Sequence, residues 1–214
     1  MKIRFYSFLI ILFFFGQRIY SATITSSGTA SGWNNTSTWV GGVVPGLNDD
    51  VIIAATHSVN ITSPASAKSL TINGSLNIIS GGINVYGNVV NSGTLSGSST
   101  LWVRATGSPT TFSSSTSITS GTLILRASVT PTKSFQINSG TVFTALNQFI
   151  ISGSTGGTVT NNGTITLVNL LSVTNATFKN GATGNFTTKK NITLGTGGVL
   201  DCSTAGNIFR YAGT

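Results

Sequence analysis

Asn73-Gly74-Ser75-Leu76 is the first clear copy of a phrase that recurs along the chain, a glycine-bearing turn followed by a short run of alternating apolar residues. Further copies are Asn91-Ser92-Gly93-Thr94-Leu95, Ser120-Gly121-Thr122-Leu123, Ser139-Gly140-Thr141-Val142 and Asn162-Gly163-Thr164-Ile165, with weaker ones at Asn180-Gly181-Ala182 and Gly197-Gly198-Val199-Leu200. Successive glycines, at positions 74, 93, 121, 140, 163, 181 and 198, are 17 to 28 residues apart. A repeat of about 20 residues, built of short strands and turns without helix, is typical of one coil of a β-solenoid.

Within each repeat the apolar residues occupy alternate positions, as in a strand with one buried side. Leu101 and Val103, for example, share a face opposite Trp102. The same period appears in the pairs Leu76 and Ile78, Leu123 and Leu125, Phe149 and Ile151, Ile165 and Leu167, and Ile192 and Leu194. If each pair points inward onto the pair of the next coil, the chain is an all-β protein that forms a parallel β-helix of about eight or nine coils. We expect its interior to be a stack of aliphatic side chains.

The composition favours a folded protein with few charges. Of the 214 residues, 39% are hydrophobic and only 7% are charged, and glutamate is absent. A chain rich in Ser, Thr, Gly and Asn could be disordered, but its apolar residues recur in short β-branched runs, which indicates a packed core. Cys202 is the only cysteine, so no disulfide within the chain can stabilise the fold, and the stacking of coils must do so.

Residues 1–21 have the pattern of a secretory signal peptide. Lys2 and Arg4 give a positive start, an apolar stretch follows, and Ser21 is a small residue at the expected cleavage point. The alternative is an uncleaved membrane anchor, for which the apolar stretch is short. We therefore expect a secreted, extracellular or cell-surface protein with no membrane span after signal cleavage. The mature chain then divides into an N-terminal capping β segment at 22–72 and β-helix coils at 73–214.

Basic residues outnumber acidic ones but are spread along the sequence. The chain has 11 Lys and Arg against three Asp, a net charge of +8; without Lys2, Arg4 and Arg18 the count is 8 against 3, or +5. A nucleic-acid groove needs clustered charge with interleaved aromatic residues, so the scatter predicts no nucleic-acid partner. Solvated surface positions explain these residues, and weak attraction to an acidic polysaccharide or a negative cell surface is the alternative.

Trp33 and Trp39 lie six residues apart near the start of the mature chain. A solenoid must cover its open end, and we interpret these large side chains as part of an N-terminal cap. The alternative is that aromatic residues stack on sugar rings. Trp33, Trp39 and Trp102 are therefore the candidate ligand-binding residues.

The acidic residues offer little for catalysis or metal binding. Asp49 and Asp50 adjoin in a predicted turn, where they can cap the following strand, and the alternative is a single Ca²⁺ held with backbone carbonyls. Neighbouring side chains on an extended backbone face opposite ways, so Asp49 and Asp50 are poorly placed to form a carboxylate pair for glycoside cleavage. Asp201 is about 150 residues away, and without glutamate no second pair can be assembled. His57, the only histidine, has no evident orienting partner. The sequence thus predicts neither an enzyme nor a bound cofactor.

A longer motif runs Trp…Trp-x-Gly-Gly-x-x-Pro-Gly-x-x-Asp-Asp-Val-x-Ile over residues 33–53, followed by Val-x-Ile at 59–61 and Leu-x-Ile-x-Gly-x-Leu at 70–76. It resembles the opening of large secreted surface proteins of Bacteroidetes-type bacteria, and it is similar to the start of the G8 domain, a glycine-rich β module of extracellular proteins. The resemblance covers about residues 31–80. It implies a right-handed parallel β-helix with an adhesive or passenger role. The present chain is shorter than such proteins usually are.

These observations favour a non-catalytic, exported cell-surface or adhesin-type module that presents a hydroxyl-rich, nearly uncharged face to glycans or other cell-surface components. Two alternatives stay open: a fragment of a polysaccharide-active β-helix enzyme, and a structural stalk without a ligand. The stalk is suggested because the repeat runs through Gly198-Val199-Leu200 without an obvious polar cap. An unpaired strand edge there could meet another copy, giving end-to-end self-association, or a C-terminal continuation.

Overall fold

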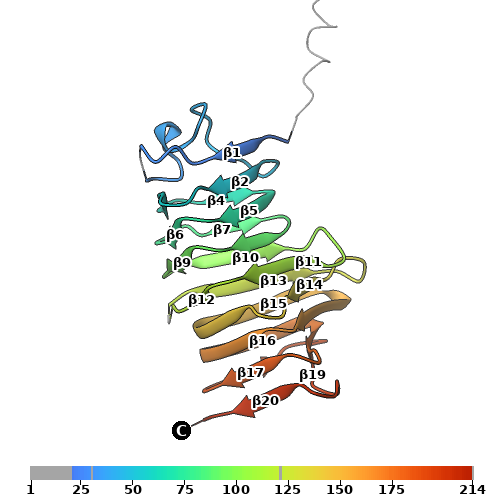
Figure 1. The fold of residues 1–214 in the computed structure, drawn as a ribbon. Coiled ribbons are helices and arrows are strands. Elements are labelled where there is room, and N and C mark those ends of the chain that lie inside the picture. The colour runs from blue at the N-terminus through green and yellow to red at the C-terminus, as the bar shows by residue number, and fades with distance from the viewer. Residues whose placement is uncertain (1–20, 30, 121, 214) are drawn as a thin grey trace, which may run out of the picture.

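The computed structural model describes residues 21–29, 31–120 and 122–213. This part of the chain winds into a parallel β-solenoid of about seven turns, with short strands stacked in one column (Figure 1). The predicted fold class is confirmed, although eight or nine coils is too many. The expected signal peptide lies outside the described residues, apart from Ser21.

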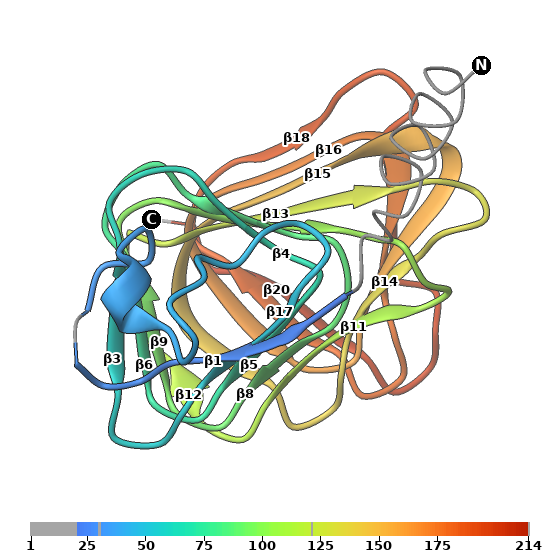
Figure 2. The same cartoon turned by 90° about the horizontal axis from the view of Figure 1, so that it is seen from above.

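Each full turn contributes strands to three faces that enclose the core (Figure 2). The first face contains β1 (Thr23–Thr25), β2 (Asp50–Ile53), β5 (Ser69–Ile72), β8 (Val89–Asn91), β11 (Thr110–Ser114), β14 (Phe135–Ile137) and β19 (Val199–Asp201). The second contains β3 (Ser58–Ile61), β6 (Ser75–Ile78), β9 (Thr94–Gly97), β12 (Ser117–Ile118), β17 (Asn185–Thr188) and β20 (Ile208–Tyr211). The third contains β4 (Ala65–Ala67), β7 (Ile83–Val85), β10 (Thr100–Arg104), β13 (Ile124–Val129) and β18 (Ile192–Leu194). The long strands β15 (Val142–Asn161) and β16 (Thr164–Asn180) bend through the corners and join all three faces.

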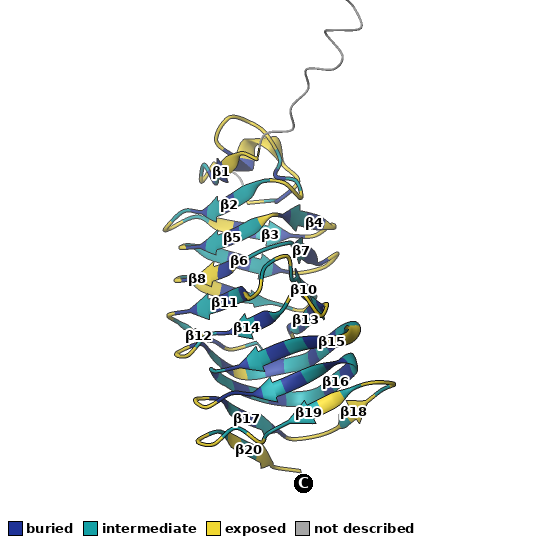
Figure 3. Cartoon of the chain, turned by 90° about the vertical axis from the view of Figure 1, so that its right-hand side faces the viewer, coloured by how far each residue is buried: buried dark blue, intermediate teal, exposed yellow. Residues whose placement is uncertain are grey.

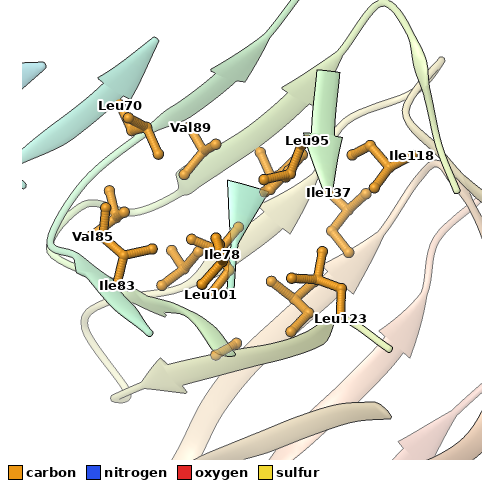
Figure 4. Close-up of a cluster of buried hydrophobic side chains, with 14 of the residues drawn as sticks. Leu70, Ile78, Ile83, Val85, Val89, Leu95, Leu101, Ile118, Leu123 and Ile137 are labelled. Atoms are coloured by element: carbon orange, nitrogen blue, oxygen red, sulfur yellow. The ribbon is translucent and has the colours of Figure 1, made fainter. Parts of the chain in front are cut away.

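Parallel pairing between coils is in register, so inward side chains form columns through the core. On the third face one column consists of Ala65, Ile83, Leu101, Leu125, Phe149, Leu171 and Ile192. All of these except Ile192 are buried, and Figure 4 shows part of this interior. The inward positions predicted from the two-residue period are confirmed for the pairs up to Leu167. Leu194, at the end of the stack, is exposed because no described coil covers it.

The repeat length explains why the coil number was overestimated. Along the column just described, successive residues are 18 to 24 positions apart, and the middle coils are the longest. The segment between β1 and β2 forms a cap rather than a coil. In addition, the repeated glycines do not all mark one corner: Gly163 connects the first face to the second, whereas Gly198 lies between β18 and β19, where the third face meets the first. Gly121 is outside the described residues.

Glycine is required sterically at the corner between the first and second faces. Gly74 and Gly93 occupy equivalent turns in successive coils. A Cβ atom on Gly93 would lie 1.9 Å from the carbonyl oxygen of Gly74, and one on Gly74 would lie 2.3 Å from the carbonyl oxygen of Ala54. The close approach of backbones at this corner therefore excludes any side chain.

The interior changes from aliphatic to aromatic along the axis. The first coils are filled by Ile, Leu and Val, whereas Phe112, Phe135, Phe143, Phe149, Phe178 and Phe186 are fully buried in the later ones. Phe178 contacts Phe149 and Phe186 edge-on, with ring centroids 5.8 and 5.2 Å apart. The expectation of an all-aliphatic interior is thus wrong for the second half. Longer coils enclose a wider cross-section, and phenylalanine supplies the volume that close packing needs there.

Buried amides stabilise the corner between the first and second faces. Asn161 donates from Nδ2 to Asn180 Oδ1 at 2.9 Å, and Asn180 donates in turn to the carbonyl oxygen of Ile208 at 2.9 Å. Earlier in the stack, Asn91 donates to Ser114 Oγ at 2.9 Å. These bonds link successive coils while satisfying polar groups that water cannot reach.

The two ends of the stack differ (Figure 3). At the N-terminal end, η1 (Thr36–Thr38) and its neighbours cover β1, while β2 already pairs with β5, so no break in the stack occurs at residue 72. Exposed apolar side chains occur at both ends, with Val40, Val43 and Leu47 in the N-terminal cap and Leu194, Val199, Ile208 and Tyr211 on the last coil. Within the described part of the chain η1 is the one helical element, and nothing helical there has the length and hydropathy to cross a bilayer.

Replacing Phe178 by Ala tests the aromatic half of the core. The substitution removes a fully buried ring between two others, and we expect it to lower the free energy of unfolding by about 3–5 kcal/mol. Urea denaturation measures the change. The control Val90→Ala alters an exposed residue on β8 and should cost less than about 0.5 kcal/mol. Similar losses in both variants would contradict the role assigned to the Phe178 ring.

Candidate functional site

Trp33 and Trp39 lie in the N-terminal cap. Their rings contact at a centroid distance of 4.9 Å and an interplanar angle of 74°, and Trp39 Nε1 donates to the Trp33 carbonyl oxygen at 2.6 Å. Trp39 also bridges antiparallel to Ser26, which closes the outer edge next to β1. The two side chains are only 1% and 2% exposed. This arrangement agrees with the capping interpretation and leaves no ring surface on which a sugar could stack.

Asp49 and Asp50 are held by hydrogen bonds within the first coils. Asp49 accepts from the backbone N–H groups of Gly46 and Ala22, at 2.8 and 3.2 Å. Asp50 accepts from the Ser69 hydroxyl and pairs with Lys68 Nζ at 3.1 Å. The turn-capping interpretation therefore accounts for Asp49. No group of three or more metal-ligating side chains occurs among the described residues, and nothing beyond these two carboxylates points to calcium.

The Asp50–Lys68 pair lines one wall of a shallow groove of about 370 Å³ at the corner between the third and first faces. The other lining residues include Gly87, Thr106 and Thr110. The hydrogen bond from Ser69, the burial that opposes it and the ammonium of Lys68 together leave the pKa of Asp50 below its usual 3.8. A carboxylate that is kept ionised by an ion pair and hydrogen bonds is poorly suited to act as a general acid or base near neutral pH.

His57 has a partner that the sequence does not reveal. Its Nδ1 lies 2.9 Å from the hydroxyl of Ser26, which also accepts the backbone N–H of Ala54 at 2.9 Å. The Ser26 hydroxyl therefore links the imidazole of His57 to the backbone at Ala54. Ser26 is buried, so its oxygen is inaccessible to a substrate, and no carboxylate of the described residues makes a hydrogen bond to the imidazole. The pair fixes the end of β1 to the turn before β3 rather than forming a nucleophile relay.

Trp102 is the one candidate tryptophan on the outer surface. It lies on β10, between the inward Leu101 and Val103, and its side chain is partly exposed. In the register of the third face its neighbours are Asn84 on the preceding coil and Arg126 on the following coil. The outward column that contains it consists of Ser66, Asn84, Trp102, Arg126, Ile150, Ser172 and Thr193.

Two arginines contact the Trp102 ring. The guanidinium carbon of Arg104 is 3.9 Å from the ring centroid, and that of Arg126 is 4.7 Å away. Arg104 also donates from Nε to Asn84 Oδ1 at 2.9 Å and lies 5.7 Å from the Tyr86 ring. We call these four residues, Tyr86, Trp102, Arg104 and Arg126, the third-face cluster. Such contacts attract a cation to an aromatic face and hold long side chains in fixed positions.

The sequence signals only part of this cluster. Alternation places Trp102 and Arg104 outward on one strand, but Arg126 is 24 residues later, and its position beside Trp102 depends on the register between coils. The basic residues that looked scattered are therefore gathered in part by the fold.

Comparison with protein-family models, curated proteins and solved structures finds no match to this chain. The resemblance to Bacteroidetes-type surface proteins and to the G8 domain therefore stays a prediction. The site must be interpreted from its own chemistry.

Replacing Asp50 by Asn tests the ion pair at the groove. Because the folded protein lowers the pKa of Asp50 below 3.8, this carboxylate contributes stability above that pH and loses it as the pH falls through the folded value. We expect the wild type to lose stability below about pH 4 more steeply than Asp50→Asn, by less than about 1 kcal/mol because the pair is largely exposed. Thermal unfolding between pH 2 and 7, roughly the range that spans the titration, measures the difference. Parallel curves for the two proteins would show that the pair does not act as described.

Proposed function

We propose that the protein is an exported, non-catalytic surface module of the adhesin type that binds glycans or other cell-surface components through the third face of the solenoid. The observation that carries this proposal is the partly exposed Trp102 in a column of otherwise mainly polar, outward side chains. An aromatic ring beside hydroxyl and amide groups provides both the apolar and the hydrogen-bonding contacts that sugars require.

The outer surface of the third face supports binding to an extended ligand. Its outward residues beside Trp102 and Arg104 include Ser128, Ser152, Ser172 and Thr174, each of which follows the register of the coils. Neighbouring coils are about 4.8 Å apart, so these groups repeat regularly along the axis. A polymer that runs parallel to the axis from Arg104 would meet hydroxyl groups on the next three coils, at Ser128, Ser152 and Thr174.

The positions of the carboxylates support binding without catalysis. Asp49 and Asp50 make structural hydrogen bonds in the first coils, and Asp201 accepts from Ser203 in the last coil. The stack separates Asp201 from the other two, and Asp49 and Asp50 are each held by structural hydrogen bonds rather than facing one another as a catalytic pair would. Secretion is also part of the proposal, and its support is the signal-peptide pattern of residues 1–21.

A structural stalk is a second candidate, favoured by the exposed apolar side chains on the last coil. The described strands β18 and β20 pair on one side only, with β16 and β17 respectively, and Leu194 and Ile208 are exposed beside them. A further coil, from another copy or from a continuing chain, would cover these residues and complete the pairing.

A glycan array probed with the purified protein tests the binding proposal. We expect binding that persists in the triple variant Asp49→Asn, Asp50→Asn, Asp201→Asn and that drops about tenfold or more in Trp102→Ala, which loses the aromatic surface. Far-UV circular dichroism checks that both variants are folded. Glycan turnover, or binding that disappears with the carboxylates, would contradict the proposal in favour of the enzyme.

Sedimentation velocity at increasing protein concentration distinguishes the stalk. A stalk that grows by stacking of coils should associate further as the concentration rises, and Ile208→Lys should abolish this association by placing a charge on the exposed edge. Val90→Lys, which places the same charge at another exposed apolar position, is the matched control. If the protein stays monomeric at all concentrations and binds glycans, the stalk is contradicted and the binding module is supported.

A further inference from the structure

We infer that the third-face cluster binds the acidic groups of an anionic polysaccharide, namely the carboxylates of uronic acid residues or sulfate esters. The inference rests on the proposed function, since it names the class of glycan that the third face would take. It assigns Arg104 and Arg126 as the residues that contact the acidic group and Trp102 as the residue that positions them.

Two positive charges share one aromatic ring in this cluster. Arg104 and Arg126 come from adjacent coils and approach the ring of Trp102 at 3.9 and 4.7 Å. Because both guanidinium groups contact one ring, two positive charges are concentrated at one place on the third face. An anion beside this ring would be attracted by both of them.

The described part of the protein supplies no such anion. The whole sequence has three acidic side chains, Asp49, Asp50 and Asp201. Among the described residues the one ion pair joins Asp50 to Lys68, while Asp201 is bound to Ser203 in the last coil. Neither arginine of the cluster has a carboxylate partner in this part of the chain.

The guanidinium groups retain unused donors. Arg104 donates to Asn84 through Nε alone, so its two terminal nitrogens make no hydrogen bond to the described residues. Arg126 makes no side-chain hydrogen bond to them at all, whereas Trp102 Nε1, also without a partner there, is buried and out of reach of a ligand. A planar guanidinium with free terminal N–H groups matches the two oxygens of a carboxylate or a sulfate.

The surroundings favour a polysaccharide over a nucleic acid. The outward column that contains Trp102 has no second aromatic residue among the described coils, whereas proteins that bind single-stranded nucleic acids stack successive bases on several aromatic side chains. The neighbouring outward residues Ser128, Ser152 and Ser172 bear hydroxyl groups rather than charges. Such a surface pairs with sugar hydroxyls on either side of an acidic group, whereas a phosphate backbone requires a continuous row of cations.

Equilibrium binding to four probes tests the inference. The probes are polygalacturonate for carboxylates, dextran sulfate for sulfate esters, unmodified dextran as a neutral glycan, and oligothymidylate as a phosphodiester polymer. We expect the wild type to bind one or both of the acidic glycans at least about tenfold more tightly than dextran. The comparison of the first two probes identifies which acidic group is preferred. Tighter binding to oligothymidylate than to either acidic glycan would overturn the assignment to polysaccharide.

Charge-matched variants separate the cluster from a general effect of net charge. Arg104→Gln/Arg126→Gln removes two positive charges from the cluster, and Lys189→Gln/Lys190→Gln removes two exposed ones between β17 and β18. The first variant should weaken binding to the acidic glycan about tenfold or more, and the second should change it less than about twofold. Equal effects of the two variants would overturn the inference.

Two further variants examine geometry. Arg104→Lys/Arg126→Lys keeps both positive charges but removes the planar guanidinium groups, so we expect it to bind the acidic glycan more weakly than the wild type. Trp102→Phe keeps an aromatic face for both arginines and should restore most of the binding lost in Trp102→Ala. If Arg104→Gln/Arg126→Gln, shown to be folded by its melting curve, still binds acidic glycans like the wild type, the inference fails while glycan binding survives. If the wild type binds none of the glycans, the proposed function fails as well.

Discussion

The fold depends on one constraint: each coil must place its inward side chains on those of the next while its backbone pairs with the same neighbour. Parallel in-register pairing satisfies both requirements at once, because residues that are hydrogen-bonded across coils also share an inward or outward direction. The columns of the core, the amide contacts at the corner and the outward columns all follow from this registration. A coil without neighbours would leave its apolar side in water, so stability is shared among coils rather than located in any one of them.

The strands and their inward residues could be predicted from the sequence because a two-residue period is a local property. Leu101, Val103 and Trp102 take the directions that alternation assigns to them. The number of residues in a coil is different, since it depends on how much chain the corners use. The glycines gave a misleading measure, because Gly163 and Gly198 mark different corners. The aromatic filling of the later coils follows from this larger perimeter, which no local pattern reports.

The candidate site shows the same division between local and non-local information. The two capping tryptophans and the Asp49 turn were assigned from short-range chemistry, and the structure places them accordingly. The partner of His57 and the meeting of Arg126 with Trp102 could not be predicted, because both depend on residues that lie more than twenty positions apart in the sequence. A scattered set of basic residues in a solenoid sequence is therefore weak evidence against a charged cluster in the folded protein.

The scarcity of charge has a consequence for the conditions under which the protein works. Its single described ion pair, Lys68–Asp50, has side chains that are 51% and 34% exposed, so dissolved ions weaken little attraction in the folded state. A rise in ionic strength should thus not destabilise the fold through the loss of ion pairs. The contacts that we propose between the guanidinium groups and an acidic polymer would respond in the opposite manner, since mobile ions compete for them directly. In one molecule, salinity would then regulate attachment while the scaffold stays intact.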